Sequence, residues 1–128
     1  MEFHHIGIAV SNIEKYYYEI LKPLFGFNNL SNIITNQSQN VKVAFAENDN
    51  SVRFELIEAI DDKSPVIKIL KRNNGGLYHL GFISNDFEDD VSKLRKNGFF
   101  LISNKKGVAF LTSPSFETYE IINGSIYW

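Results

Sequence analysis

The sequence of 128 residues contains no cysteine, and this absence limits the chemistry that the chain can perform. Without thiols there is no disulfide framework, no thiolate metal site and no cysteine nucleophile. A metal ion bound to this chain would therefore have to use histidine nitrogen and carboxylate oxygen as ligands. A chain of this length can bury a hydrophobic core without such links, so we expect one ordinary domain.

An excess of positive charge and a long hydrophobic run are also missing. The chain carries 13 basic and 15 acidic residues, with a formal net charge of −2, which provides no basic surface for nucleic acid or for a membrane. No apolar run approaches the length of a membrane span, and the opening "MEFHHIG" lacks the pattern of a signal peptide. We therefore expect a cytoplasmic protein that binds a small molecule rather than nucleic acid or a membrane.

The first strand is predicted at residues 4–10, which are mostly β-branched and apolar. Alternation of side chains places His4 on the apolar face that is expected to form the core, where a structural role is favoured for it. His5 and Gly7 then lie together on the opposite face. The glycine leaves room beside the imidazole of His5 for an ion and a ligand.

A helix is predicted over residues 13–24, because its apolar residues follow helical spacing. Ser11 or Asn12 is expected to cap the start of this helix. Pro23 is expected to distort or end its last turn, and Gly26 marks the exit of the chain from the helix.

The polar, asparagine-rich segment 28–40 is predicted to form an irregular or edge strand. Residues 41–60 are predicted to form a hairpin, because two strand-like runs are joined at residues 48–50, which tolerate turn conformations. Glu58, near the end of the second run, is expected to be exposed to solvent.

A short helix over residues 64–72 is predicted to link the two halves of the chain. Ser64 would cap it and Pro65 would occupy its first position, while Gly75 and Gly76 would close it. The second half of the chain then repeats the plan of the first.

The repeat aligns the residues that are able to bind a metal. His79 follows His5 by 74 residues, and each half contains the letters "VAF" in its later part. Glu55 and Glu120 each lie twelve residues beyond the valine of that motif. The chain has only 3 histidines, so the coincidence of two histidines and two carboxylates indicates a common site rather than chance.

Two imidazoles and two carboxylates form a mixed nitrogen and oxygen ligand set. Burying a carboxylate within an apolar strand is costly unless it is paired or binds a cation, and a metal ion removes that cost. The set suits a divalent ion such as Co, Ni, Mn, Zn or Fe, and Mg less well. Four protein ligands, His5, Glu55, His79 and Glu120, would leave two positions of an octahedral ion for water or substrate.

The motifs "HHIGIAVSNIEK", "RFELIE", "GGLYHLGF" and "YEII" resemble those of the vicinal oxygen chelate superfamily, which includes glyoxalase and methylmalonyl-CoA epimerase. The resemblance implies an α+β fold in which two βαβββ modules form a U-shaped mixed β-sheet around a metal site. It implies a single domain over residues 1–128, with module one at about 1–60, a linker helix at about 64–73 and module two at about 76–128.

The methylmalonyl-CoA epimerase branch is the most similar, because of its serine-proline linker and the glycine pair before the second histidine strand. This branch implies a divalent-metal-dependent isomerase that removes the proton next to a carbonyl polarised by the metal, via an enolate. Glu120 would then act as catalytic base as well as ligand. The substrate would be a small molecule, for example an acyl-CoA, and the protein a homodimer.

Other functions stay open at this point. One is a glyoxalase-like lyase of the lactoylglutathione lyase type, and another is a non-catalytic resistance protein of the same fold that binds a small molecule. A ring-cleaving dioxygenase is disfavoured, because it needs two histidines and only one carboxylate. Epimerases carry an acidic residue before the "VAF" strand, whereas residues 28–46 contain no Asp or Glu.

Overall fold

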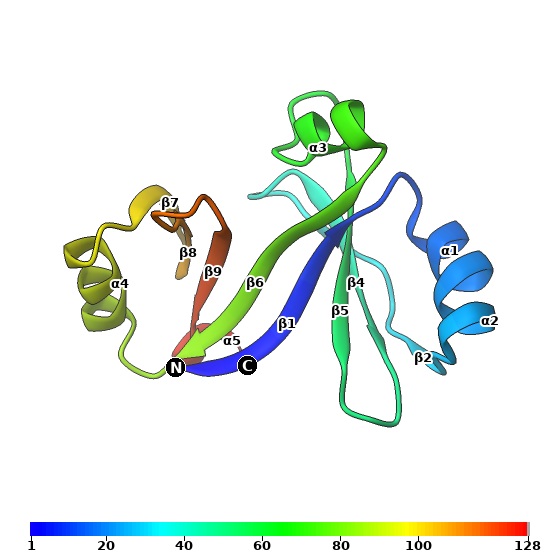
Figure 1. Cartoon of the computed structure of the whole chain (residues 1–128), viewed down its shortest axis with the longest axis horizontal. Coiled ribbons are helices and arrows are strands. Elements are labelled where there is room, and N and C mark those ends of the chain that lie inside the picture. The colour runs from blue at the N-terminus through cyan, green and yellow to red at the C-terminus, as the bar shows by residue number, and fades with distance from the viewer. Residues whose placement is uncertain (128) are drawn as a thin grey trace. The chain divides into compact units, whose positions relative to one another are not determined.

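The computed structural model describes residues 1–127, whose strands form a mixed, open β-sheet accompanied by helices (Figure 1). This confirms the predicted α+β class. By its internal contacts the chain divides into two compact units: unit 1 comprises residues 1–5 and 79–127, and unit 2 comprises residues 6–78. Within the described residues, no helix has both the length and the apolar character needed to cross a membrane.

The strands of unit 2 are joined in the order β2, β4, β5, β1, and β3 also pairs with β4. Only residues 6–9 of β1 belong to unit 2, because its first residues are part of unit 1. Pairing of β1 with β5 is parallel, whereas β4 pairs antiparallel with β2, β3 and β5. These strands have the bounds β1 (Glu2–Ala9), β2 (Asn29–Leu30), β3 (Ile34–Asn36), β4 (Val41–Glu47) and β5 (Arg53–Ala59). The predicted hairpin and the short edge strands before it are therefore confirmed.

The strands of unit 1 are joined in the order β6, β9, β8, β7. The pair β6 and β9 is parallel, and the pairs β8–β9 and β7–β8 are antiparallel. Their bounds are β6 (Gly76–Ser84), β7 (Phe100–Lys105), β8 (Val108–Thr112) and β9 (Thr118–Asn123), and a short helix α5 (Gly124–Tyr127) follows. The two units thus repeat one arrangement of a parallel pair and its antiparallel neighbours.

The helix of unit 2 runs continuously from α1 (Ile13–Tyr16) through a π-helical segment, Tyr17–Leu21, to α2 (Lys22–Phe25). Asn12 caps it by accepting a hydrogen bond of 2.8 Å from the backbone N–H of Lys15. Pro23 distorts the helix without ending it. Pro23 lies inside this continuous helix, where its missing N–H and its ring disturb the α-helical pattern, and the wider π-helical segment directly precedes it.

Glu58 of β5 is tied to the start of this helix. Its carboxylate accepts a hydrogen bond of 2.9 Å from the backbone N–H of Ile13, and it lies 3.8 Å from the Nζ atom of Lys42. The prediction that Glu58 is solvated was therefore wrong. The first N–H groups of a helix lack partners within the helix and attract negative charge, which explains the contact.

The linker helix α3 (Ile67–Asn73) begins later than predicted, with Val66 as its N-terminal cap. Ser64 is buried and its hydroxyl has no hydrogen-bond partner within residues 1–127, so it does not cap the helix through its side chain. The helix ends at Asn74, whose φ of 58° is left-handed, rather than at the glycine pair. Asparagine adopts this conformation more readily than most residues.

Both faces of β1 are buried in unit 2. Ile8 and Val10 pack with residues of the helix in one apolar cluster, as predicted for the core face. Ala9, on the opposite face, packs in a second cluster with Ile57 and Val66, the residue that caps the linker helix. The prediction that one face alone forms the core was therefore incomplete, because the linker covers part of the other face.

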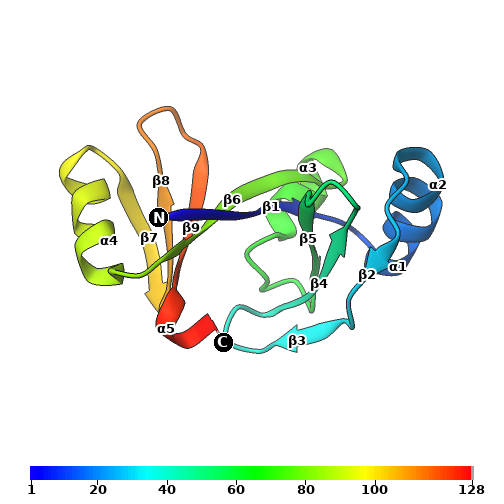
Figure 2. The same ribbon diagram turned by 90° about the horizontal axis from the view of Figure 1, so that it is seen from below.

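The core of unit 1 lies between helix α4 (Phe87–Lys96) and the sheet (Figure 2). Phe87 and Val91 of the helix pack on Ala109, Leu111 and Ile121 of β8 and β9. Spacing of four residues between Phe87 and Val91 places them on one face of the helix, which explains this packing.

The register of the strands repeats between the two units. Gly7 is paired with Glu55 in the parallel pair β1–β5, and Gly81 is paired with Glu120 in the parallel pair β6–β9. The offsets that relate these positions, 81 − 7 = 74 and 120 − 55 = 65, are those found in the sequence repeat. The repeat that was read from the residues therefore corresponds to a repeat of strand pairing.

Candidate metal centre

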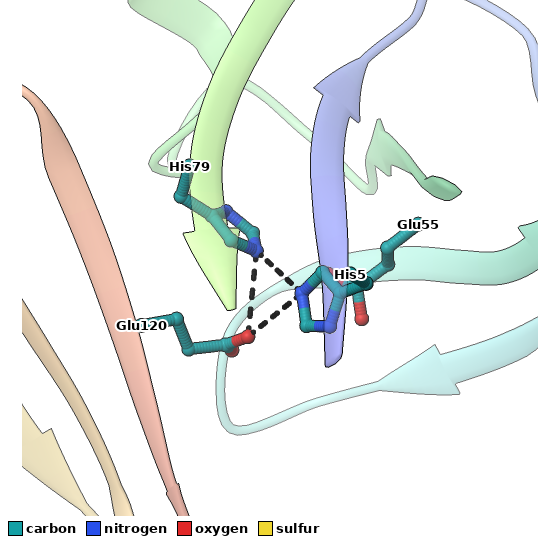
Figure 3. Close-up of side chains that lie close together, drawn as sticks. All are labelled: His5, Glu55, His79 and Glu120. Carbon is teal, nitrogen blue, oxygen red and sulfur yellow. Dashed lines mark hydrogen bonds and ion pairs between the residues drawn. The ribbon is translucent and has the colours of Figure 1, made fainter. Parts of the chain in front are cut away.

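Three polar side chains of unit 1 point toward one another (Figure 3). The Nε2 atom of His5 on β1 lies 2.9 Å from the Nε2 atom of His79 on β6. The Oε1 atom of Glu120 on β9 lies 3.0 Å from the former and 3.3 Å from the latter. Strands from distant parts of the sequence thus bring two imidazoles and one carboxylate together.

All three side chains are almost inaccessible to solvent. The exposed fraction is 0% for His5, 5% for His79 and 8% for Glu120. The two Nε2 atoms and Oε1 lie within 4.8 Å of one another, and each offers a lone pair when both imidazoles are neutral with their hydrogens on Nδ1. Such an arrangement is favourable only when a proton or a metal cation lies among them, and two imidazoles with a carboxylate suit a divalent transition metal. The residues therefore fit a metal ion.

Gly81 makes room for the ring of His5. It lies on β6 two residues after His79, and a Cβ atom built on it would lie 2.5 Å from Nε2 and 2.6 Å from Nδ1 of His5. Real side chains essentially never approach so closely. The glycine in the "HLGF" motif is therefore required by the imidazole of His5 itself.

An aromatic ring borders His79. Phe110 of β8 meets the imidazole edge to face, with ring centroids 5.4 Å apart and an interplanar angle of 79°. Phe110 is also paired in register with Glu120, so the strand pairing that places the carboxylate places this ring as well. Such an apolar neighbour lowers the local dielectric and strengthens electrostatic interactions in the site.

His4 contacts His5 directly, with 2.8 Å between the two Nδ1 atoms. The sequence placed His4 on the opposite face of the strand with a structural role, because adjacent strand residues ordinarily point apart. In the structure both rings turn so that they meet. The pair of adjacent histidines was the available signal for this contact, but strand alternation outweighed it in the prediction.

Glu55, the fourth residue of the predicted ligand set, belongs to unit 2. It lies on β5, paired in register with Gly7 of β1 and with Phe45 of β4. This position matches that of Glu120 in unit 1, where the neighbours are Gly81 and Phe110. Figure 3 draws Glu55 with the three residues of unit 1. Its role as a ligand stays a prediction.

Two opposing influences act on the pKa of Glu120. Burial raises the pKa, because it disfavours the charged carboxylate. Hydrogen bonds and electrostatic interactions with His5 and His79 outweigh burial and lower the pKa from 4.5 to about 2. Glu120 therefore remains ionised throughout the neutral range and is available as an anionic ligand.

The lowered pKa predicts a loss of stability in acid for the metal-free protein. Since the pKa is lower in the folded state, the stabilisation is present above pH 4.5 and is lost as the pH falls toward about 2. The full loss is on the order of 3 kcal/mol. Urea unfolding at several pH values, with a chelator present, is expected to show this loss in the wild type and a smaller one in Glu120→Gln. Equal losses in both proteins would contradict it.

The sequence is similar to those of known proteins. Residues 4–112 match the model of the glyoxalase/bleomycin resistance protein/dioxygenase superfamily. The uncharacterized protein YqjC of Bacillus subtilis (strain 168) is 32% identical over 118 residues, which cover 84% of this chain and 80% of that protein. The mitochondrial methylmalonyl-CoA epimerase of Dictyostelium discoideum is 28% identical over 94 residues, which cover 73% of this chain and 55% of that enzyme.

Solved structures with the same fold include a methylmalonyl-CoA epimerase variant of Streptomyces coelicolor in complex with 2-nitronate-propionyl-CoA. It has a TM-score of 0.77 and 22% sequence identity, and the match covers 96% of each chain. At this identity the likeness shows the fold alone. The family model, by contrast, matches most of the sequence, including the three histidines of β1 and β6. The chain therefore belongs to the glyoxalase/bleomycin resistance protein/dioxygenase superfamily, also called the vicinal oxygen chelate superfamily.

Proposed function

We propose that the protein is a divalent-metal-dependent isomerase of the methylmalonyl-CoA epimerase type. The observation that carries this proposal is the buried cluster of two imidazoles and one carboxylate, with Nε2 to Oε1 distances of 3.0 and 3.3 Å. Similarity to a curated epimerase in sequence, and to a further epimerase in fold, supports the reaction type.

His5, His79 and Glu120 would hold the metal, and we propose Glu55 as the fourth ligand because the repeat gives it the strand register of Glu120. A divalent ion at this centre would act as a Lewis acid toward a carbonyl oxygen and make the neighbouring C–H group more acidic. The cobalt, nickel, manganese, zinc and iron ions all suit such a ligand set, and magnesium suits it less well.

Glu120 is proposed to accept the proton from the substrate. Its Oε1 atom lies against both imidazoles, which leaves Oε2 as the oxygen for proton transfer. A carboxylate is a weak base, so the reaction would favour a substrate proton that is itself acidified, such as one between two carbonyl groups. A 2-substituted malonyl thioester carries such a proton.

The proposed substrate is therefore an acyl-CoA of the methylmalonyl type. This choice is supported by the fold neighbour from Streptomyces coelicolor, which was solved with a propionyl-CoA derivative. Assembly into a homodimer stays a prediction that derives from the resemblance to the superfamily.

A glyoxalase-like lyase is the second candidate, and one observation favours it. Epimerisation needs a second acid that returns the proton on the other face of the substrate, and residues 28–46 contain no Asp or Glu for this role. Transfer of a proton between adjacent carbons needs only one base, which Glu120 would provide.

Proton exchange at the α-carbon of methylmalonyl-CoA in deuterated water tests the proposal. The metal-loaded protein is expected to catalyse the exchange, and Glu120→Gln is expected to reduce its rate about 10²- to 10⁴-fold, the usual contribution of general base catalysis. The exchange is followed by NMR or mass spectrometry. Metal binding without exchange would reject the epimerase assignment. Turnover of an adduct of methylglyoxal and a thiol would support the lyase instead.

A further inference from the structure

Two adjacent histidines of β1 share a buried hydrogen bond. The Nδ1 atoms of His4 and His5 are 2.8 Å apart, and the rings are nearly perpendicular, with an interplanar angle of 88°. The exposed fractions of the two residues are 9% and 0%. Because neighbouring side chains of a strand ordinarily point to opposite faces, regular strand geometry alone does not produce this contact.

The hydrogen bond couples the tautomers of the two rings. A bond between two Nδ1 atoms needs one hydrogen, carried by either ring. If His4 carries it, a neutral His5 has its own hydrogen on Nε2, which lies 3.0 Å from Oε1 of Glu120. If His5 carries it on Nδ1, its Nε2 atom presents a lone pair. Only this second arrangement allows neutral His5 to bind a cation through Nε2.

We propose that His4 is a positioning residue of the metal centre. Its Nδ1 atom accepts the Nδ1–H of His5 and so fixes His5 in the tautomer that directs the Nε2 lone pair toward His79 and Glu120. This inference rests on the metal binding that the proposed function requires. Histidine ligands commonly donate their second N–H to a carboxylate, a backbone carbonyl or water. In this chain the imidazole of the preceding residue takes that place.

Zinc affinity of two variants tests the role of His4. His4→Phe keeps an aromatic ring but removes the acceptor, and it is expected to weaken Zn²⁺ binding about 10- to 100-fold, the usual effect of losing such a partner. His4→Asn fills less space but offers an amide oxygen close to the position of Nδ1, so it is expected to recover most of the affinity. Competition with a chromophoric chelator measures both. A residue that only fills space would give the reverse order, with phenylalanine better tolerated than asparagine.

A second measurement uses the wild-type protein and does not depend on the folding of a variant. Nitrogen-15 NMR of the histidine side chains in the zinc-loaded protein is expected to show the hydrogen of His5 on Nδ1, bonded to His4. A hydrogen on His4 Nδ1, or unchanged zinc affinity in His4→Phe, would overturn the role of His4. If the wild type meanwhile binds zinc and catalyses proton exchange, the proposed function stands. A wild type that binds no zinc would overturn both proposals.

Discussion

Replacement of Glu120 by alanine is expected to lower the affinity of the protein for a divalent cation by more than about 100-fold. Loss of a partner that merely orients a ligand already costs about 10- to 100-fold, and Glu120 is proposed to bind the ion itself. It also supplies the only carboxylate of the unit 1 cluster formed with His5 and His79. Metal content after purification and titration with Zn²⁺ or Co²⁺ in the presence of a competing chelator measure the effect.

Glu117→Ala provides a matched control. Glu117 precedes β9 by one residue and is exposed, so the substitution removes the same charge close to the same strand. Its metal affinity is expected to equal that of the wild type. If Glu120→Ala retained the metal content of both proteins, the three converging side chains would not be a metal centre, and the enzymatic proposal would lose its basis.

Gly81→Ala is expected to disrupt the centre without altering any ligand. The added methyl group would lie 2.5 Å from His5 Nε2, the atom proposed to bind the metal. The ring must therefore move, and overpacking of this kind typically costs about 1 to 3 kcal/mol of folding stability. We expect a lower unfolding midpoint in urea and a drop in metal affinity of at least about tenfold, measured on the same preparations.

A double-mutant cycle with His5→Ala separates the clash from a general effect on β6. Once the imidazole is absent, the methyl group at position 81 has the space that the ring occupied, so Gly81→Ala is expected to cost little in that background. Leu77→Ala, at an exposed position of the same strand, controls for substitution in β6. A cost that is equal with and without the His5 ring would show that the glycine serves another purpose.

The strands and the repeat could be read from the sequence because they depend on local patterns. Alternation and the recurrence of histidine and glutamate are properties of residue order, and the pairs Gly7–Glu55 and Gly81–Glu120 have the same register in the structure. The expectation that His5, Glu55, His79 and Glu120 share one site was drawn from this symmetry. The positions of the histidines alone, or of the glutamates alone, would not have indicated a common site.

The details that the sequence did not reveal depend on contacts between segments. Glu58 was predicted to be solvated, whereas it accepts a hydrogen bond from a backbone N–H group 45 residues away, a contact that no local pattern indicates. Ser64 does not cap the linker helix, because Val66 packs in the core and the helix begins after it, at Ile67. His4 was placed by ideal strand alternation, which does not describe how its ring rotates to meet His5.

The two parallel pairs, β1–β5 and β6–β9, have the same register, and this restricts where residues can be inserted or deleted. Successive side chains of a strand point to opposite faces. Inserting or deleting one residue of the strand before Gly7 or Gly81 would therefore turn the imidazole of His5 or His79 away from the site. The helices and loops tolerate such events, as the π-helical segment Tyr17–Leu21 and the unequal spacing of the halves illustrate. Among descendants of this chain, insertions and deletions of any length should therefore occur between the strands. Within the strands, an odd number of inserted or deleted residues should be avoided.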